Sequence, residues 1–174
     1  GYHADSFHTI NLAQMASDIA QATQGALQIE LHADNTLAKL NEIADAVRTG
    51  KAEAGETIMS GLVAQMPLAG ADSVPFIVRS YDDAQRLWKC QRPLIESAFA
   101  ERGLTVLYAV PWPPQGLYSI QPVARMSDLR GSRMRTYNAT TVRIAELVGA
   151  TPVDVAMVGV GQAMAEGRID SMIT

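Results

Sequence analysis

Apolar side chains recur every three or four residues in several stretches of the chain, a spacing that places them on one face of an α-helix. In residues 9–24, for example, Leu12, Met15 and Ile19 share a face, and Gly25 follows as a stop signal. The same pattern predicts helices at 9–24, 38–49, 80–102, 140–148 and 160–166. Pro93 lies inside the third of these, so we expect a kink or a break there.

Shorter segments between the helices alternate apolar and polar residues or are rich in β-forming residues. Leu27, Ile29 and Leu31, for example, alternate with polar neighbours. Strands are predicted at 27–31, 53–60, 104–110, 117–120, 133–136, 152–155 and 169–173. Because helices and strands alternate along the chain, the sequence predicts an α/β fold with a largely parallel sheet.

The order of helix, glycine and strand near Gly25 and Gly50 is repeated near Gly149 and Gly167. Only an alanine, the glycine and an acidic residue align between the two copies, so chance explains the likeness about as well as duplication does. Two similar α/β units would nevertheless suit two lobes with a cleft between them.

Composition narrows the function classes. Of 174 residues, 48% are hydrophobic and 18% charged, which is typical of a globular protein. The 14 Lys and Arg residues form no cluster, which argues against nucleic-acid binding. No apolar run is long enough to span a bilayer. The single cysteine, Cys90, has no internal disulfide partner, and we expect it to be a small buried hydrophobe in a helix.

The two ends of the chain also carry information. The first residues lack the charged and apolar segments of a secretory signal peptide, so we expect a cytoplasmic, mature or trimmed chain. Residues 169–174 end as a strand without a turn, and we expect trimming there as well.

Catalytic and metal-binding patterns are absent from the sequence. It contains no GxSxG, HExxH or GxxxxGK[ST] motif. His3 and His8 share a segment, but their separation fits no standard metal site. The sequence therefore predicts a protein that is not an enzyme and has no metal or cofactor.

Two loop or strand-end features indicate a binding site. The Pro-Trp-Pro-Pro-Gln-Gly loop at 111–116 follows a predicted strand, where ligand crevices form, although Trp112 could equally plug the core. Arg133 and Arg135 share one face of a predicted strand. An arginine followed by Tyr137 and Asn138 suits a carboxylate clamp, with a solvated surface arginine as the alternative.

The N-terminal segment is a third candidate. Tyr2, Phe7, His8 and Asn11 crowd before or at the start of a predicted helix. Aromatic and polar side chains beside a helix N-terminus suit an anion site. Packing of the N-terminus accounts for the same pattern equally well.

Several motifs together resemble one family. They are Ser127-Asp128-Leu129-Arg130-Gly131-Ser132-Arg133-Met134-Arg135, then Glu146-Leu147-Val148-Gly149-Ala150, then Ala163-Met164-Ala165-Glu166-Gly167-Arg168-Ile169-Asp170. In this order they resemble the solute-binding proteins of TRAP (tripartite ATP-independent periplasmic) transporters, the DctP-type family. Upstream, residues 22–32 and 43–50 are similar to the first lobe of that family.

The resemblance implies a periplasmic binding protein-like, type II-like fold of two lobes that close on an organic acid. It implies residues 1–115 as most of lobe I, without its first strand. Residues 116–174 would be the first part of lobe II, ending near the crossover back to lobe I. The expected activity is periplasmic binding of the acid and its delivery to a TRAP permease, with no nucleic-acid partner and no membrane insertion.

The carboxylate-binding arginine of the family falls on Arg135. The expected ligand-contacting residues are Arg135, Trp112, Tyr118, Tyr137, Asn138, Gln115, His8, Phe7, Asn11 and Ser60. Many members carry a second arginine in a G-F-R run, where this chain has Gly116-Leu117-Tyr118. This departure predicts a monocarboxylate such as a hydroxy, keto or aromatic acid. A ligand-sensing module, or an enzyme on a similar scaffold, are the alternatives.

Overall fold

The computed structural model describes residues 2–174 and divides into two compact units. The first unit ends at Thr57, and the second runs from Ile58 to Thr174. The two lobes expected on either side of residue 115 stay a prediction.

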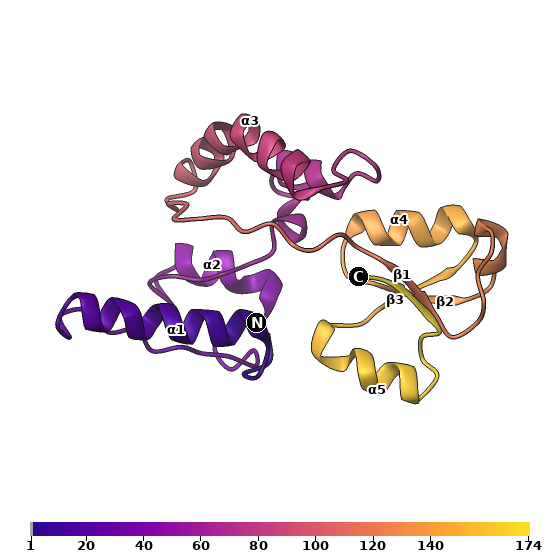
Figure 1. Ribbon diagram of the computed structural model, residues 1–174, viewed down its shortest axis with the longest axis horizontal. Helices are drawn as coiled ribbons and strands as arrows, with labels where there is room; N and C mark the ends of the chain where they lie inside the picture. Colours follow the sequence, from indigo (N-terminus) through magenta and orange to yellow (C-terminus); the bar gives the residue numbers. More distant parts are fainter. Residues whose placement is uncertain (1) are drawn as a thin grey trace. The chain divides into compact units, whose positions relative to one another are not determined.

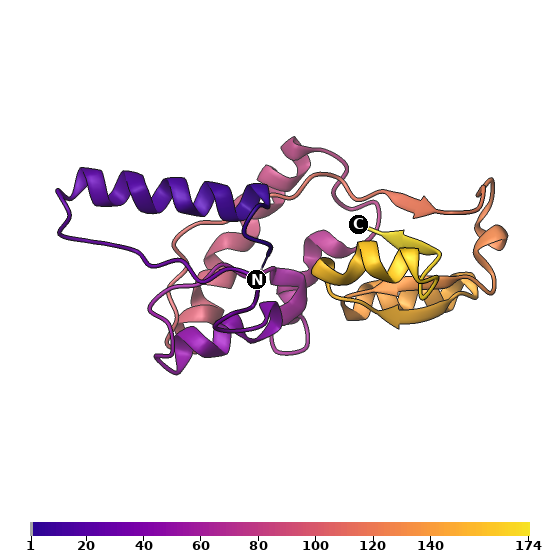
Figure 2. The ribbon, with the colours of Figure 1, turned by 90° about the horizontal axis from the view of Figure 1, so that it is seen from below.

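The first unit is built around helix α1 (Phe7–Ala22). Ser6 caps this helix because its hydroxyl accepts the backbone N–H of Thr9 at 3.3 Å. The chain then runs back along α1 as an extended segment (Figures 1 and 2). It continues into the 3₁₀ helix η1 (Leu40–Glu42) and helix α2 (Ile43–Arg48). Both predicted helices of this unit are thus confirmed.

The second unit begins with two 3₁₀ helices, η2 (Met59–Leu62) and η3 (Pro67–Ser73), which precede helix α3 (Tyr81–Ala100). The helix begins at the predicted place, since the Ser80 hydroxyl accepts the Asp83 backbone N–H at 3.1 Å. Beside it, the side-chain amide of Gln91 donates to the Leu68 carbonyl of η3. Helix α3 is therefore tied to the preceding turns as well as packed on them.

Two details of α3 differ from the sequence analysis. The helix is continuous through Pro93, so of the kink or break expected there the break does not occur, although proline removes one backbone donor. Cys90 is exposed, so the prediction that it is buried was wrong. The buried side of the helix contains Gln91 and Ile95, and Cys90 lies off that stripe.

The rest of the second unit is a four-stranded sheet in the order β1-β4-β2-β3. Its elements are β1 (Leu117–Ser119), η4 (Met126–Leu129), β2 (Arg133–Thr136), α4 (Ala139–Val148), β3 (Thr151–Asp154), η5 (Met157–Gly159), α5 (Val160–Ala165) and β4 (Ser171–Ile173). Strand β2 pairs in parallel with both β3 and β4, while β1 is antiparallel to β4. The predicted α/β fold with a largely parallel sheet is confirmed.

Helices α4 and α5 cover opposite faces of this sheet (Figure 1). On one face, Met134 of β2 packs with Ala145 of α4 and with Leu129. On the other, Val155 packs with Ala163 of α5 and with Ile169. Each face therefore has its own small hydrophobic core, and β2 lies in the middle of the sheet between them.

Three predicted strands do not form. Residues 27–31, 53–60 and 104–110 are not strands in the part of the chain that the structure describes. Their apolar side chains, such as Leu27 and Leu107, are more than half exposed. Alternation identifies a segment that suits a sheet, but a strand also needs a neighbouring backbone to pair with. These segments lack that ladder, and residues 59 and 60 begin the 3₁₀ helix η2 instead.

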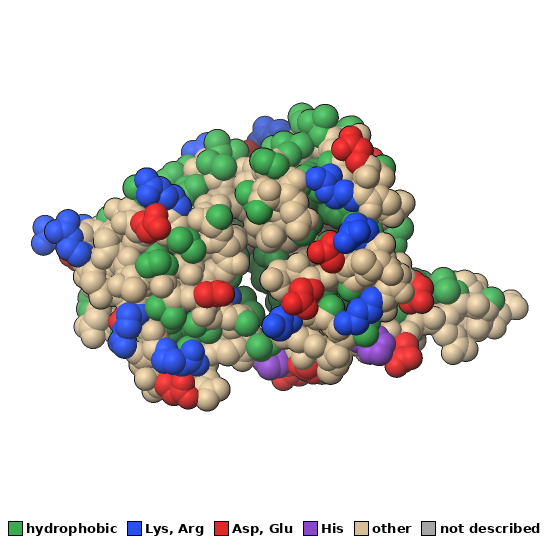
Figure 3. All heavy atoms as spheres, turned by 180° about the vertical axis from the view of Figure 1, so that it is seen from behind, with side chains coloured by type: hydrophobic (Ala, Val, Ile, Leu, Met, Phe, Trp, Pro, Cys, Tyr) green, Lys and Arg blue, Asp and Glu red, His purple; other side chains and the backbone are tan. Residues whose placement is uncertain are grey.

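Charged side chains of both signs are interspersed with hydrophobic ones on the surface seen in Figure 3. Within residues 2–174, no helix combines the length and the apolar character needed to cross a lipid bilayer.

Candidate ligand-binding site

The topology brings four chain segments to one edge of the sheet. Parallel strands β2, β3 and β4 all end there, and β1 starts there because it runs antiparallel to β4. Two hydrogen bonds between Gly116 and Thr174, N···O 2.9 and 3.1 Å, close the β1–β4 pair at this edge. The crevice beyond the carboxyl ends of parallel strands is where α/β folds bind ligands.

Arg135 lies at this edge and is only 2% exposed. Its Nε donates to the Val155 carbonyl oxygen at 2.8 Å. Arg135 is paired with Val153 in the sheet, so Val155 lies just beyond it at the same edge. Its Nη1 atom is buried and has no hydrogen-bond partner within residues 2–174. A buried cationic donor without a partner is costly unless a ligand completes it.

Tyr137 and Gln115 meet beside this arginine. The Tyr137 ring lies over the guanidinium, with its centroid 4.8 Å from Arg135 Cζ. The Tyr137 hydroxyl donates to Gln115 Oε1 at 3.1 Å. Gln115 reaches it because residue 115 immediately precedes the start of β1. Three of the predicted site residues thus form one cluster.

Burial shapes the electrostatics of this cluster. Loss of solvent lowers the pKa of the Arg135 guanidinium, while Tyr137 and Asp154 act in the opposite direction. The side chain still keeps its charge at neutral pH. Loss of solvent also raises the pKa of the Tyr137 phenol; the Arg135 charge opposes this rise, and Asp72 adds to it. The site therefore presents a fixed cation beside a neutral phenol.

Arg133, at the start of the same strand, is paired with an acidic residue of the protein. Its Nε lies 3.0 Å from Asp170 Oδ2, and its backbone N–H donates to Asp170 Oδ1 at 2.7 Å. Its side chain is 50% exposed. Arg133 therefore ties β2 to the turn before β4.

Asn138 caps helix α4. Its side-chain oxygen accepts the backbone N–H of Thr141 at 2.9 Å. The Thr141 hydroxyl oxygen in turn accepts the backbone N–H groups of Tyr137 and Asn138, at 3.1 and 3.2 Å. This cap holds the backbone of Tyr137 in place independently of its phenol.

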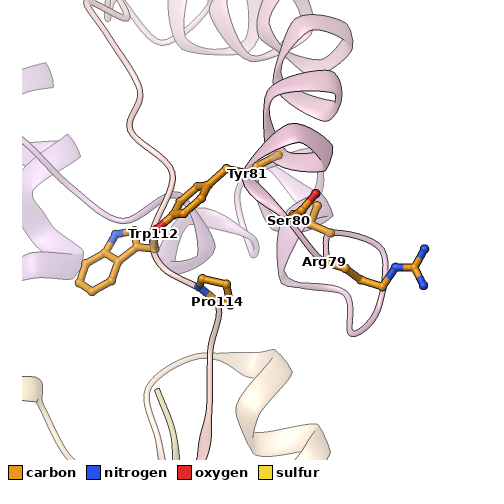
Figure 4. A pocket seen from close by; sticks show the side chains of 7 residues that line it. Arg79, Ser80, Tyr81, Trp112 and Pro114 are labelled. Atoms are coloured by element: carbon orange, nitrogen blue, oxygen red, sulfur yellow. The ribbon is translucent and has the colours of Figure 1, made fainter.

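Trp112 lies in a different place. It lines a small pocket of about 50 Å³ together with Val78, Arg79, Ser80, Tyr81, Ala84 and Pro114. In Figure 4 the Tyr81 ring lies beside Trp112 and Pro114, while Arg79 points away. The pocket has room for only a few water molecules. The role of Trp112 as a ligand wall stays a prediction.

Two more predicted residues of the second unit have no described contact with the Arg135 cluster. Tyr118 is exposed on β1, and its ring folds over Gly116, where an added Cβ would lie 3.1 Å from it. Ser60 is buried in η2. Their contribution to ligand binding stays a prediction.

The remaining predicted residues belong to the first unit. The His8 ring stacks on Tyr2, with centroids 4.6 Å apart, and lies 4.0 Å from the Phe7 centroid. Its Nδ1 is 3.7 Å from Glu56 Oε1. Asn11 is exposed on α1. The aromatic crowding predicted at the start of α1 therefore exists as a stacked group, and its role in binding stays a prediction.

Two participants were missed by the sequence analysis. The Val155 carbonyl oxygen orients Arg135; the sequence predicted strands at 133–136 and 152–155 but not that they pair. Asp72 in η3 acts electrostatically on Tyr137. Burial raises the pKa of the Asp72 carboxyl, while hydrogen bonds from Ser73 and the backbone act against that rise. No motif marks this aspartate.

Comparison with known proteins gives a consistent result. Residues 3–173 match the model of the DctP family, bacterial extracellular solute-binding protein family 7. Two similar structures are the Bordetella pertussis extracytoplasmic solute receptors DctP7 and DctP6, both binding pyroglutamic acid. They are 40% and 38% identical to the chain, with TM-scores of 0.94 and 0.95 over 99% of it. A pyroglutamate-specific TRAP solute-binding protein from a marine metagenome is 35% identical, with a TM-score of 0.94 over the full chain.

The matched proteins are longer than this chain. It covers 58% and 57% of DctP7 and DctP6, and 57% of the metagenome protein. A curated relative, a solute-binding protein of Chromohalobacter salexigens, is 25% identical over 162 residues, which are 91% of this chain and 48% of the relative. The chain thus spans about half the length of its curated relatives.

Proposed function

Because this chain belongs to family 7 of the bacterial extracellular solute-binding proteins, the DctP family of TRAP transporters, we propose that the whole protein carrying it is a periplasmic receptor. It binds a small monocarboxylate of the pyroglutamate class and delivers it to a TRAP permease without altering it chemically. The three solved receptors described above, which are 35–40% identical to this chain, bind pyroglutamate or pyroglutamic acid.

The observation that carries the proposal is the state of Arg135. It is buried, oriented by Val155, and left with an unpartnered Nη1 within residues 2–174. An arginine fork can take both oxygens of one carboxylate. Tyr118, an uncharged residue, stands where the resemblance places a second arginine in many family members, which favours one carboxylate over two.

A thermal-shift screen of the whole protein tests the ligand class. The panel contains pyroglutamate, hydroxy and keto monocarboxylates, aromatic acids, dicarboxylates and uronates. A ligand at about 100 times its Kd adds roughly 2.7 kcal/mol of stability. We expect this for pyroglutamate or a close monocarboxylate. Stabilisation by dicarboxylates or uronates alone would contradict the proposed ligand class.

The receptor role has its own test. The whole protein is incubated with its tightest ligand, which is then recovered and analysed by mass spectrometry. Since no nucleophile and base are paired in the Arg135 cluster, we expect unchanged ligand. Chemical conversion above a control without protein would favour an enzyme instead.

A further inference from the structure

We infer that Tyr137 selects ligands that carry a hydrogen-bond donor beside their carboxylate, and that Gln115 sets this selectivity by holding the phenol proton. The inference rests on the proposed function, in which Arg135 binds the carboxylate. It adds a second chemical criterion to that site, namely an N–H or O–H group on the ligand.

The direction of one hydrogen bond carries the argument. The Tyr137 hydroxyl donates its single proton to Gln115 Oε1 at 3.1 Å. A phenol has one proton and can also accept. With its proton committed to Gln115, the oxygen presents only lone pairs to any other group. It can then accept a hydrogen bond from a ligand but cannot donate one.

The Tyr137 side chain is held against the guanidinium that, by the proposed function, binds the carboxylate. The Tyr137 ring lies over the guanidinium, 4.8 Å from Arg135 Cζ to the ring centroid. Its backbone N–H is fixed by Thr141 at the start of α4. A small acid bound by Arg135 therefore places the substituents next to its carboxylate within reach of the phenol. In pyroglutamate, the neighbouring group is the lactam N–H, a donor.

The electrostatics of the site keep the phenol in the required state. Burial raises the pKa of Tyr137, and the charge of Arg135 only partly opposes this. The phenol is therefore neutral at physiological pH and retains the proton that it gives to Gln115. An acceptor on the ligand would face a lone pair of the phenol oxygen. The phenol could then donate either to Gln115 or to the ligand, and the other hydrogen bond would be lost.

The test compares two ligands of nearly the same shape. Pyroglutamate has a lactam N–H beside the carboxylate, and 5-oxotetrahydrofuran-2-carboxylate has a lactone ring oxygen in the same place. Calorimetry on the whole protein should show about tenfold tighter binding of the lactam. In Tyr137→Phe, which keeps the ring over Arg135 but lacks the hydroxyl, the two affinities should agree to within about threefold.

Gln115→Ala separates selection from simple packing. Gln115 is exposed in the loop before β1, so its removal leaves the core intact. The freed phenol can turn its proton toward the lactone oxygen, so we expect the lactone to bind more tightly than it does to wild type. A role of Gln115 in structure alone would weaken both ligands equally.

The outcomes distinguish the inference from the proposed function. An unchanged lactam preference in Tyr137→Phe would overturn the inference while leaving the receptor role intact. Arg135→Ala should weaken both ligands by a similar factor, because it removes the shared carboxylate contact. If wild type binds neither ligand, the pyroglutamate class itself is wrong, and the inference falls with it.

Discussion

Strand β2 carries two arginines in opposite situations. Arg133 is half exposed and paired with Asp170, through both its side chain and its backbone. Arg135, two residues on and on the same face by alternation, is 2% exposed and has a buried nitrogen without a partner in residues 2–174. One arginine has an acidic partner within the protein, and the other has a buried nitrogen that no group in residues 2–174 satisfies.

The difference teaches how to separate structural from binding charges. A paired and half-exposed arginine stabilises the fold slightly, and water satisfies its remaining donors, so it needs no ligand. A buried arginine with an unpaired donor lowers the stability of the free protein. That cost is offset when a ligand supplies the missing partner. The pattern of polar and apolar residues does not distinguish the two arginines, because both stand at polar positions of the same alternating segment.

The largest expected effect comes from the Arg135 end. Arg135→Ala should weaken binding of the ligand by about 3–5 kcal/mol, roughly two to four orders of magnitude in Kd, because the carboxylate would be buried without its cation. Arg135→Lys keeps the charge without the fork, so a smaller loss is expected. Calorimetry on the whole protein measures both.

Arg133→Ala is the matched control for that measurement. It removes an arginine from the same strand and the same face but should change Kd only slightly. A larger loss for Arg133→Ala than for Arg135→Ala would reverse the comparison. Equal small losses would mean that the anion is bound elsewhere.

The middle of β2 gives the next largest effect. Met134 is fully buried between the two arginines and packs with Leu129 and Ala145. Met134→Ala should reduce the free energy of unfolding by about 2–5 kcal/mol, since it leaves a cavity in the core below α4. Urea denaturation measures this loss. Met126→Ala, at an exposed methionine, is the control and should change stability by less than about 0.5 kcal/mol.

Strand β2 was predicted correctly from the sequence, whereas three other predicted strands do not form. Local pattern was sufficient for residues 133–136, because Met134 faces a core and both neighbouring strands are present. It was insufficient for 27–31, 53–60 and 104–110, which have the right composition but no ladder. Strand formation depends on distant backbone, which a single segment does not encode.

The candidate site shows the same limit. Residue 135 could be selected because the family resemblance places the carboxylate-binding arginine there, and residues 137 and 115 because they belong to the strand end and the loop that look like one subgroup of that family. Their contact depends on β1 starting where β2 ends, and the Val155 carbonyl is invisible to any side-chain pattern. The chemistry was therefore more predictable than the geometry.

A smaller effect is expected at the Arg133 end. Asp170→Ala removes the acceptor for both the Arg133 guanidinium and its backbone N–H, so it should reduce stability by about 1–2 kcal/mol. Arg133→Ala removes only the half-exposed ion pair and should cost less than about 1 kcal/mol. Thermal denaturation without ligand measures both; an effect of Arg133→Ala that exceeds that of Asp170→Ala would show that the backbone contact is unimportant.

The smallest effect concerns acid sensitivity in the turn that leads to Arg133. Asp128 accepts the backbone N–H groups of Ala124 and Arg125, at 3.0 and 3.1 Å, and these bonds lower its pKa below the ordinary value of 3.8. Because the folded pKa is the lower one, the stabilisation is present above the unfolded value and is lost as pH falls through the folded pKa. In Asp128→Asn this pH-dependent part is absent. We therefore expect the Tm of the variant to fall less than that of wild type on acidification from about pH 5 to about pH 2. Parallel Tm profiles for the two proteins would mean that the ionised carboxylate contributes nothing to this turn.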